Sequence, residues 1–170
     1  MLGDDWRWCP QCGGPLDRVV RGGAARPRCA ACGFVFFANM GVGAAVVVRD
    51  DAGRVLMVRR APNQYGAGRW CFPCGFVEWG ETVADAARRE ALEEAGVDLV
   101  LGAVVQVALN THEPERPTIG VWFDARLADP SATPVAGDDA VEAAWFDPAE
   151  PPELAFPTDV SLLARLERPR

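Results

Sequence analysis

The chain has 170 residues, of which 49% are hydrophobic and 24% are charged, so it can form one ordinary globular domain with a small appendage. It contains no run of eighteen apolar residues, and its first residues, MLGDDWRW, are acidic and polar where a signal peptide would be basic and then apolar. We therefore expect a soluble, cytoplasmic protein without a membrane-spanning segment.

The net charge of −7 is unevenly distributed along the chain. Residues 1–38 carry five Arg and three Asp, whereas residues 39–170 carry twelve Arg and 21 acidic residues. An acidic body does not favour binding along a phosphate backbone, which depends on clustered cations, but it suits the collection of divalent metal ions. The composition thus argues against a nucleic-acid partner.

Two C-x-x-C pairs stand near the beginning of the chain, Cys9 with Cys12 and Cys29 with Cys32. A glycine follows each pair, and it lets the chain turn so that backbone N–H groups approach sulfur. Four thiolates at this spacing predict a closed, structural Zn²⁺ site, whereas disulfides within the pairs would close small, strained loops. We predict a zinc ribbon over residues 1–38, with the metal supplying most of its folding free energy.

A third pair, Cys71 and Cys74, has the same spacing. It lies between an apolar strand and a glycine, not at the start of a helix that would lower a thiol pKa. We favour inert packing cysteines here, with a second metal site or a redox switch as the alternatives.

Residues 39–170 predict a second domain, which begins with strands. Two β-branched runs joined by residues 50–53 indicate a hairpin over residues 41–60, and a short apolar segment follows at residues 70–76. Further strands are predicted at residues 98–109, 118–127 and 141–146.

Two helices complete this domain. Thr82 followed by Asp85 resembles a capping box, and Gly96 is a stop signal, so a helix is predicted at residues 82–95. Thr158 can cap a last helix that ends near Glu167. The first helix has one small apolar face, made of Ala84, Ala87, Ala91 and Ala95. Together these elements predict an α+β layered domain with a largely mixed sheet.

Three glutamates, Glu90, Glu93 and Glu94, crowd the first predicted helix. At i, i+3 and i+4 they lie on one face, which we expect to be opposite the alanine face. A solvated acidic face is the alternative, because like-charge neighbours on a helix cost only about 0.2 to 0.5 kcal/mol per pair. The spacing of the surrounding residues must therefore decide.

The stretch from Gly75 to Val97 resembles the Nudix hydrolase signature, G-x5-E-x7-R-E-U-x-E-E-x-G-U, in which U is a bulky aliphatic residue. All seven fixed letters are present, although Ala91 is smaller than the usual first U. The resemblance extends from Gly41 to about Glu167, and the preceding ribbon is similar to that of NADH pyrophosphatase-like and plant FAD pyrophosphatase-like members. It implies an α/β/α sandwich with a mixed sheet.

The resemblance also implies a metal-dependent hydrolase of phosphoric anhydrides. In the family, Mg²⁺ or Mn²⁺ ions bound by carboxylates neutralise a diphosphate and activate water. Glu81 is expected to orient Arg89, which in turn fixes the glutamates. A further acid is expected from Asp139, with Glu142 as the second choice. The implied metal ligands are Glu90, Glu93 and Glu94 with the backbone carbonyl of Cys74.

The implied substrate is a nucleoside diphosphate linked to a moiety X, such as ADP-ribose, FAD or NAD(H), cleaved to two monophosphates. Trp79, Trp122 and Phe156 are candidates for stacking on a base, with core packing as the alternative for each. The array typical of NADH pyrophosphatase-like members is missing, whereas AFPTDVSLL resembles a segment of FAD- and ADP-ribose-cleaving members. His112 is expected to be a solvated loop residue, with a substrate contact as the alternative.

Two other functions compete with this interpretation. One is a non-enzymatic Nudix domain that senses a nucleotide and uses its ribbon to bind nucleic acid or a partner protein. The presence of all three helix glutamates argues against it, because a pure sensor would not need them together. The other is a nucleoside triphosphate pyrophosphatase. Dimerisation is common in the family, and the sequence leaves a homodimer open.

Overall fold

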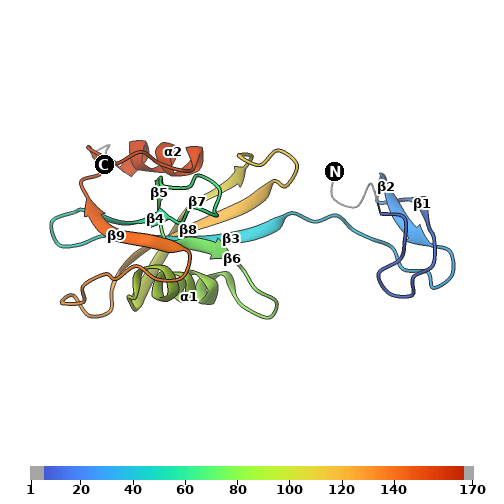
Figure 1. Ribbon diagram of the computed structural model, residues 1–170, viewed down its shortest axis with the longest axis horizontal. Helices are drawn as coiled ribbons and strands as arrows, with labels where there is room; N and C mark the ends of the chain where they lie inside the picture. Colours follow the sequence, from blue (N-terminus) through green and yellow to red (C-terminus); the bar gives the residue numbers. More distant parts are fainter. Residues whose placement is uncertain (1–5, 167–170) are drawn as a thin grey trace. The chain divides into compact units, whose positions relative to one another are not determined.

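The computed structural model describes residues 6–166, and the chain divides into two compact units (Figure 1). The first comprises Met1–Met40 with Glu113–Pro117, and the second comprises Gly41–His112 with Thr118–Arg170. No helix among residues 6–166 is long and apolar enough to cross a membrane.

The first unit is built on a β-hairpin of β1 (Leu16–Arg21) and β2 (Ala24–Cys29). Gly22 and Gly23 form its two-residue turn with φ of 59° and 77°, values that a type I′ turn requires and that glycine adopts at no steric cost. The Gly13 N–H donates to the Cys9 carbonyl at 2.9 Å, and the Gly33 N–H to the Cys29 carbonyl at 3.0 Å. Each C-x-x-C pair is therefore folded into the same tight turn.

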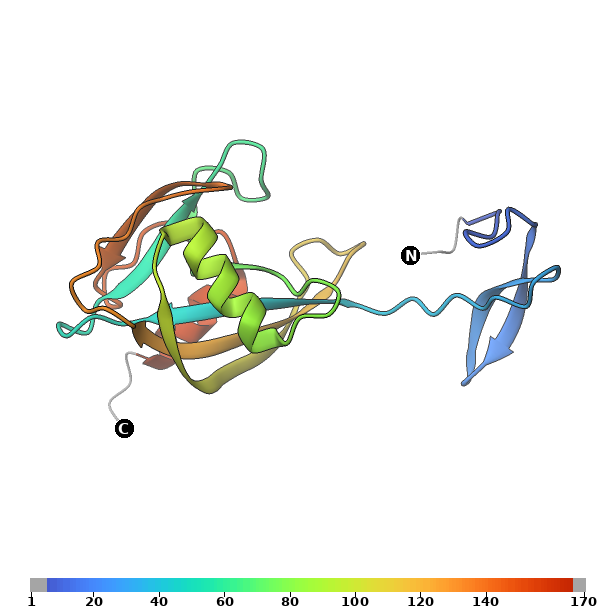
Figure 2. The ribbon, with the colours of Figure 1, turned by 90° about the horizontal axis from the view of Figure 1, so that it is seen from below.

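The second unit contains two sheets and two helices (Figures 1 and 2). A mixed sheet has the order β6-β3-β8-β7, in which β3 and β8 are parallel, and an antiparallel sheet has the order β5-β4-β9. The helices α1 and α2 lie on opposite sides of these strands (Figure 1). The elements are β3 (Gly41–Val48), β4 (Val55–Arg60), β5 (Trp70–Cys71), β6 (Cys74–Phe76), α1 (Val83–Ala95), β7 (Leu99–Asn110), β8 (Thr118–Leu127), β9 (Ala140–Phe146) and α2 (Pro157–Leu166).

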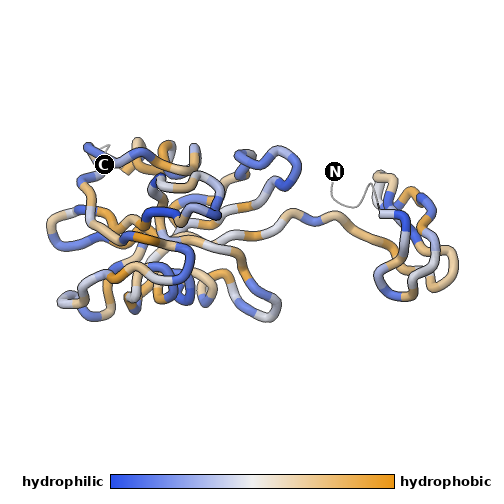
Figure 3. Tube along the Cα trace, viewed as in Figure 1, coloured by the Kyte–Doolittle hydropathy of each residue, from blue (hydrophilic) through white to orange (hydrophobic). Residues whose placement is uncertain are grey.

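Strand β3 supplies both layers of the core because successive side chains of a strand point to opposite faces. Its residues Ala44, Val46 and Val48 pack with the alanines of α1, whereas Ala45 and Val47 pack with Leu162 and Leu163 of α2. Hydrophilic residues instead fill the loop between β7 and β8 (Figure 3). The expected α+β fold, with a mixed sheet between two helices, is confirmed.

Two local predictions need correction. Strands β3 and β4 do not form a hairpin: the turn joins Asp50 N–H to the Arg54 carbonyl at 3.1 Å, but the strands then enter different sheets. The apolar segment at residues 70–76 contains two short strands, β5 and β6, which also belong to different sheets. Helix α2 begins at Pro157, so Thr158 is not its cap but donates to the Asn110 side chain at 2.9 Å. The predicted end near Glu167 lies outside the described residues.

Candidate functional site

The four ribbon cysteines form the first candidate site, a metal centre. The Sγ atoms of Cys9 and Cys32 lie 3.6 Å apart, those of Cys12 and Cys29 lie 3.5 Å apart, and all four lie within 4.8 Å of one another. Zn–S bonds of about 2.3 Å in a tetrahedron place sulfurs about 3.8 Å apart, whereas a disulfide requires about 2.05 Å. A hydrogen bond from the Cys32 backbone N–H lowers the pKa of Cys29 to about 7. The thiols therefore fit a closed, structural zinc site.

Helix α1 carries the second candidate site, and its ends are fixed by local chemistry. The Thr82 hydroxyl accepts the Asp85 N–H at 3.1 Å, so Thr82 caps the helix as predicted. Gly96 ends the helix in the left-handed region, with φ of 65°. Between these caps the helix holds Glu90, Glu93 and Glu94 in a fixed register.

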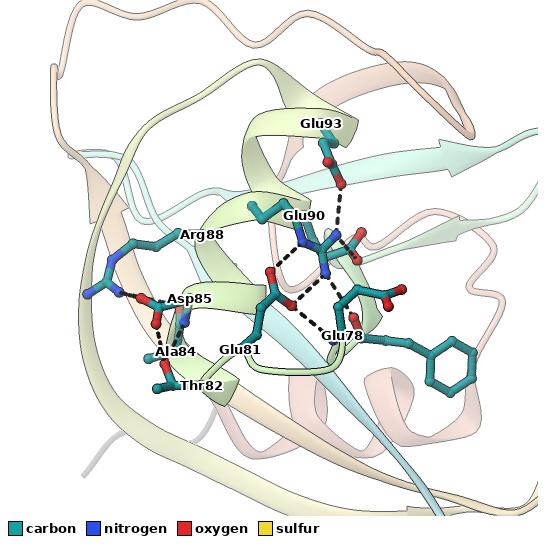
Figure 4. Close-up of polar contacts among 10 residues, drawn as sticks. Glu78, Glu81, Thr82, Ala84, Asp85, Arg88, Glu90 and Glu93 are labelled. Carbon is teal, nitrogen blue, oxygen red and sulfur yellow. Dashed lines mark hydrogen bonds and ion pairs between the residues drawn. The ribbon is translucent and has the colours of Figure 1, made fainter.

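Arg89 forms hydrogen bonds with Glu81, Glu90 and Glu93, whose side chains are labelled in Figure 4. Its Nε and NH2 donate to the two carboxylate oxygens of Glu81 at 2.7 and 3.0 Å. Its NH1 donates to Glu90 at 2.7 Å and to Glu93 at 2.8 Å, and NH2 also reaches the Phe76 carbonyl at 2.9 Å. The expected contacts of Arg89 are thus present for Glu81, Glu90 and Glu93, whereas Glu94 accepts the Cys74 N–H instead. The hydrogen bonds from Arg89 lower the pKa of Glu81 to about 2, helped by the Glu78 N–H.

Glu90 lies directly against Gly75 of β6. It is only 8% exposed, and burial raises the pKa of its carboxyl although Arg89 acts to lower it. A Cβ atom at Gly75 would lie 2.1 to 2.4 Å from the carboxylate atoms of Glu90. Glycine is therefore required at position 75 by space, because a side chain would displace the Glu90 carboxylate.

Glu94 is the most deeply buried of the three glutamates, at 1% exposure. Its Oε2 accepts the Cys74 backbone N–H at 2.8 Å. Burial raises the pKa of Glu94 to about 10, with further contributions from Cys71 and the neighbouring Asp139 carboxyl. Glu90 and Glu94 thus border the buried alanine face, and the expectation that all three glutamates lie opposite that face is wrong.

The structure separates the two candidates for a late acid. Asp139 precedes β9, and its backbone carbonyl accepts the Ala61 N–H at 2.8 Å. Its carboxyl contributes to the raised pKa of both Glu90 and Glu94. Glu142 is exposed and pairs with Arg59 at 2.8 to 2.9 Å. Asp139 therefore lies beside the glutamates, whereas Glu142 is engaged elsewhere.

The three aromatic candidates have different surroundings. Trp79 is fully exposed. Trp122 is 3% exposed, packs in the core beside α2 and donates its indole N–H to Asp159 at 2.9 Å, so its selection as a base-stacking residue is corrected. Phe156 is half-buried and contacts the rings of Tyr65 and His112, so His112 is not a solvated loop residue.

Sequence reasoning missed Asp159, which is fully buried at the start of α2. Its two carboxylate oxygens accept the Trp122 indole N–H and, at 3.3 Å, the Phe72 N–H. Burial raises the pKa of Asp159 to about 7, although these hydrogen bonds and Arg60 oppose the shift. The only signal in the sequence is an acidic residue in the first turn of a helix, which usually indicates a solvated position.

The donor set at α1 differs from that of the ribbon. Within residues 6–166, the four cysteines are the one group of three or more potential ligands whose donor atoms lie so close together. The carboxylates of α1 instead have different partners: Glu90 and Glu93 accept hydrogen bonds from Arg89, whereas Glu94 accepts the Cys74 N–H. Carboxylate and carbonyl oxygens are nevertheless what Mg²⁺ and Mn²⁺ prefer, and buried carboxyls with raised pKa values are stabilised by a cation.

This geometry defines a class of domain: a mixed sheet between two helices, with an arginine-organised glutamate cluster on one helix. The NUDIX domain model matches residues 40–166, and a zinc-ribbon model described as Nudix N-terminal matches residues 7–38. The chain belongs to the Nudix family.

Relatives of known name resemble this chain over different lengths. The NAD-capped RNA hydrolase NudC of Chromobacterium violaceum is 30% identical over 162 residues, which are 95% of this chain and 57% of the relative. The ADP-ribose pyrophosphatase of Methanocaldococcus jannaschii is 35% identical over 112 residues, which are 65% of this chain and 63% of the relative. The chain thus spans less than two thirds of the length of either relative.

A solved structure supports the same assignment. The NUDIX hydrolase from Nitrosomonas europaea matches with a TM-score of 0.80 and 28% identity, over 94% of this chain and 89% of that one.

Proposed function

We propose that this chain is a metal-dependent hydrolase that cleaves the diphosphate bond of a nucleoside diphosphate linked to a second moiety. The candidate substrates are ADP-ribose, NAD(H) and FAD, and the products are two monophosphates. The observation that carries the proposal is the Arg89 contact set, which holds Glu81, Glu90 and Glu93 beside the buried Glu94. NAD and ADP-ribose, which occur in the names of two relatives, both contain an ADP group.

The residues that would hold Mg²⁺ or Mn²⁺ are Glu90, Glu93 and Glu94, with the carbonyl of Cys74. A bound divalent ion neutralises phosphate charge and lowers the pKa of a coordinated water molecule. This role accounts for the burial of the carboxyls of Glu90 and Glu94, which disfavours their charged forms and raises both pKa values. A cation bound close by would lower these pKa values again and favour the carboxylates.

The protein's own groups prepare this site before substrate arrives. Because NH1 of Arg89 donates to Glu90 and Glu93 together, one guanidinium fixes the spacing of two carboxylates. The Asp139 side chain lies close enough to Glu94 to contribute to the raised pKa of the Glu94 carboxyl. Positioned groups of this kind lower the barrier because they need no reorganisation during the reaction.

The test is hydrolysis of ADP-ribose, NAD, NADH, FAD and nucleoside triphosphates with Mg²⁺ or Mn²⁺, with the products resolved by chromatography. We expect two monophosphates from the diphosphate-linked substrates, and a loss of about 100-fold or more in kcat for Glu94→Gln. The matched control is Glu153→Gln, because Glu153 is an exposed glutamate paired with Arg69 at 2.9 Å; it should retain activity.

The outcomes separate the competing functions. Pyrophosphate release from triphosphates alone would identify a nucleoside triphosphate pyrophosphatase. Nucleotide binding without turnover of any substrate would contradict the proposal and favour a sensor.

A further inference from the structure

The hairpin of the first unit carries arginines that neither candidate site uses. Opposite residues of an antiparallel pair share a face, and successive side chains of a strand point to opposite faces. The register places Arg26 opposite Val19, with Arg28 two residues further along β2. Arg21 lies two residues after Val19 on β1, so the three arginines share one face of the hairpin. We call this surface the arginine face.

The four-cysteine site lies on the other side of this hairpin. Cys29 immediately follows Arg28 in β2 and is paired with Leu16, so its side chain points away from the arginine face. It is 1% exposed, whereas Arg21 is exposed and Arg28 keeps 41% of its side chain exposed. Four thiolates with one Zn²⁺ carry two negative charges, and these stand behind the hairpin and not among the arginines.

Two exposed aromatic rings belong to the same face. Phe37 is 51% exposed, and the guanidinium of Arg26 lies over its ring at 4.5 Å. Trp8 is 67% exposed and pairs with Pro15, which lies two residues before Asp17, so the alternation puts Trp8 on the arginine face. The face therefore combines positive charge with flat, solvent-facing rings.

Acidic residues are scarce in this unit. Residues 6–40 contain five Arg and one acidic residue, Asp17, whereas residues 41–166 contain ten Arg and 20 acidic residues. Asp17 pairs with Arg28 at 3.6 Å, and an exposed pair of this kind contributes little free energy. The acidic charge that disfavours a nucleic-acid partner thus belongs to the second unit, and the arginine face has the opposite character.

Cations interleaved with flat rings match the chemistry of a single-stranded nucleic acid. Arginine binds phosphates, and aromatic rings and guanidinium planes stack on unpaired bases. A duplex keeps its bases inside the helix, so the rings would find no partner there. RNA presents unpaired bases in loops and at ends, whereas DNA is normally paired. An acidic peptide would engage the arginines but would leave the rings unused.

We propose that the arginine face, together with Trp8 and Phe37, binds single-stranded RNA. Arg21, Arg26 and Arg28 contact the phosphates, and the two rings stack on bases. This activity is independent of the proposed hydrolysis, because none of these residues belongs to the glutamate site.

The first test measures the charge contribution. A short fluorescent oligouridylate, which has no stable secondary structure, is titrated with the zinc-loaded full chain by anisotropy at several salt concentrations. Three phosphate contacts on a single strand predict that the logarithm of the association constant falls with the logarithm of the salt concentration with a slope of about −2. Arg21→Ala should make this slope shallower by about 0.7. The matched control is Arg126→Ala, which removes an exposed arginine from β8 of the second unit and should keep the wild-type slope.

The second test measures the contribution of the rings. Phe37→Ala should weaken oligouridylate binding by about 5- to 150-fold, the range that stacking on one aromatic residue contributes. Phe37→Trp should bind as wild type because it keeps a ring at this position. Metal analysis of each variant should give about one zinc ion per chain, which shows that the ribbon is intact.

The results that would overturn the proposal are distinct. Wild-type slope and affinity in Arg21→Ala and Phe37→Ala would place any RNA binding elsewhere on the chain. Equal affinity for polyglutamate, which has negative charge but no bases, would reduce the face to a general anion-binding surface. Tighter binding to phosphatidylglycerol vesicles than to oligouridylate would assign the face to a membrane. If Phe37→Ala loses its zinc, the salt slope of Arg21→Ala decides, because that side chain is exposed and lies outside the four-cysteine site.

Discussion

Replacing Gly75 by alanine should damage the glutamate site far more than the fold. The new Cβ would lie 2.1 Å from Oε1, 2.2 Å from Cδ and 2.4 Å from Oε2 of Glu90. Restoring ordinary contacts of about 3.5 Å moves the carboxylate by more than about 1 Å, and displacements of this size in a catalytic site cost about 100-fold in rate.

The cost in stability should be small by comparison. The atoms that must move are the end of a flexible side chain, so the main loss is the bond from Arg89 to Glu90, about 1.5 to 3 kcal/mol for a charged pair. Replacing glycine by alanine also stabilises the folded state by about 0.4 to 1 kcal/mol, because alanine has less conformational freedom than glycine in the unfolded chain. We therefore expect Gly75→Ala to be destabilised by about 0.5 to 2.6 kcal/mol and to lose about 100-fold in kcat.

The assay is ADP-ribose hydrolysis with Mg²⁺, together with thermal unfolding of the same preparations. Gly43→Ala is the control, because its added Cβ on the adjacent strand β3 meets nothing closer than the Gly75 carbonyl at 3.5 Å. A Gly75→Ala variant with kcat close to that of Gly43→Ala would refute the argument that glycine is needed to seat Glu90.

Two further outcomes follow from the buried carboxyl and the ribbon thiols. The pKa of Asp159 rises from 3.8 to about 7 on folding, so its stabilising protonated form is complete below about pH 4 and is lost as pH rises to about 7. The free energy of unfolding of wild type should fall over that range by up to about 4 kcal/mol relative to Asp159→Asn, as measured by urea unfolding; parallel pH profiles would contradict this. Cys9→Ser should release about one zinc ion per chain and unfold the ribbon, as followed by metal analysis and by NMR of residues 6–40, and full zinc retention would count against a four-thiolate site.

Much of the fold could be predicted from the sequence because its signals are local. Thr82 and Gly96 mark the ends of α1 by capping chemistry, and β8 follows its run of β-branched and aromatic residues. Sheet membership could not be predicted in the same way. The turn at Asp50 indicates a reversal of the chain, but whether β3 and β4 pair depends on distant partners, which are β8 for one strand and β9 for the other.

The candidate site shows the same division between local and distant information. The resemblance to the signature implies contacts of Arg89 with Glu81 and the helix glutamates, and those with Glu81, Glu90 and Glu93 are present. Only the Arg89–Glu93 pair, at i and i+4, follows from helical register alone. Burial of Glu94 against Cys74 is set by the packing of β6 on α1, so helical spacing alone wrongly placed all three glutamates opposite the alanine face. The rings of Tyr65, His112 and Phe156 meet although they come from three distant parts of the chain, and no local pattern connects them.

The division of residues 70–76 between two sheets limits how the chain can tolerate changes in length. Only Phe72 and Pro73 separate β5 from β6, and both are buried. An inserted or deleted residue here would shift one strand by a single position and turn its side chains to the opposite face. If β6 took up the shift, the Cys74 N–H would leave Glu94 and Gly75 would leave Glu90; if β5 took it up, Cys71 would leave Arg60. A change of length in this two-residue connection should therefore disturb either the glutamate site or the sheet that contains β5.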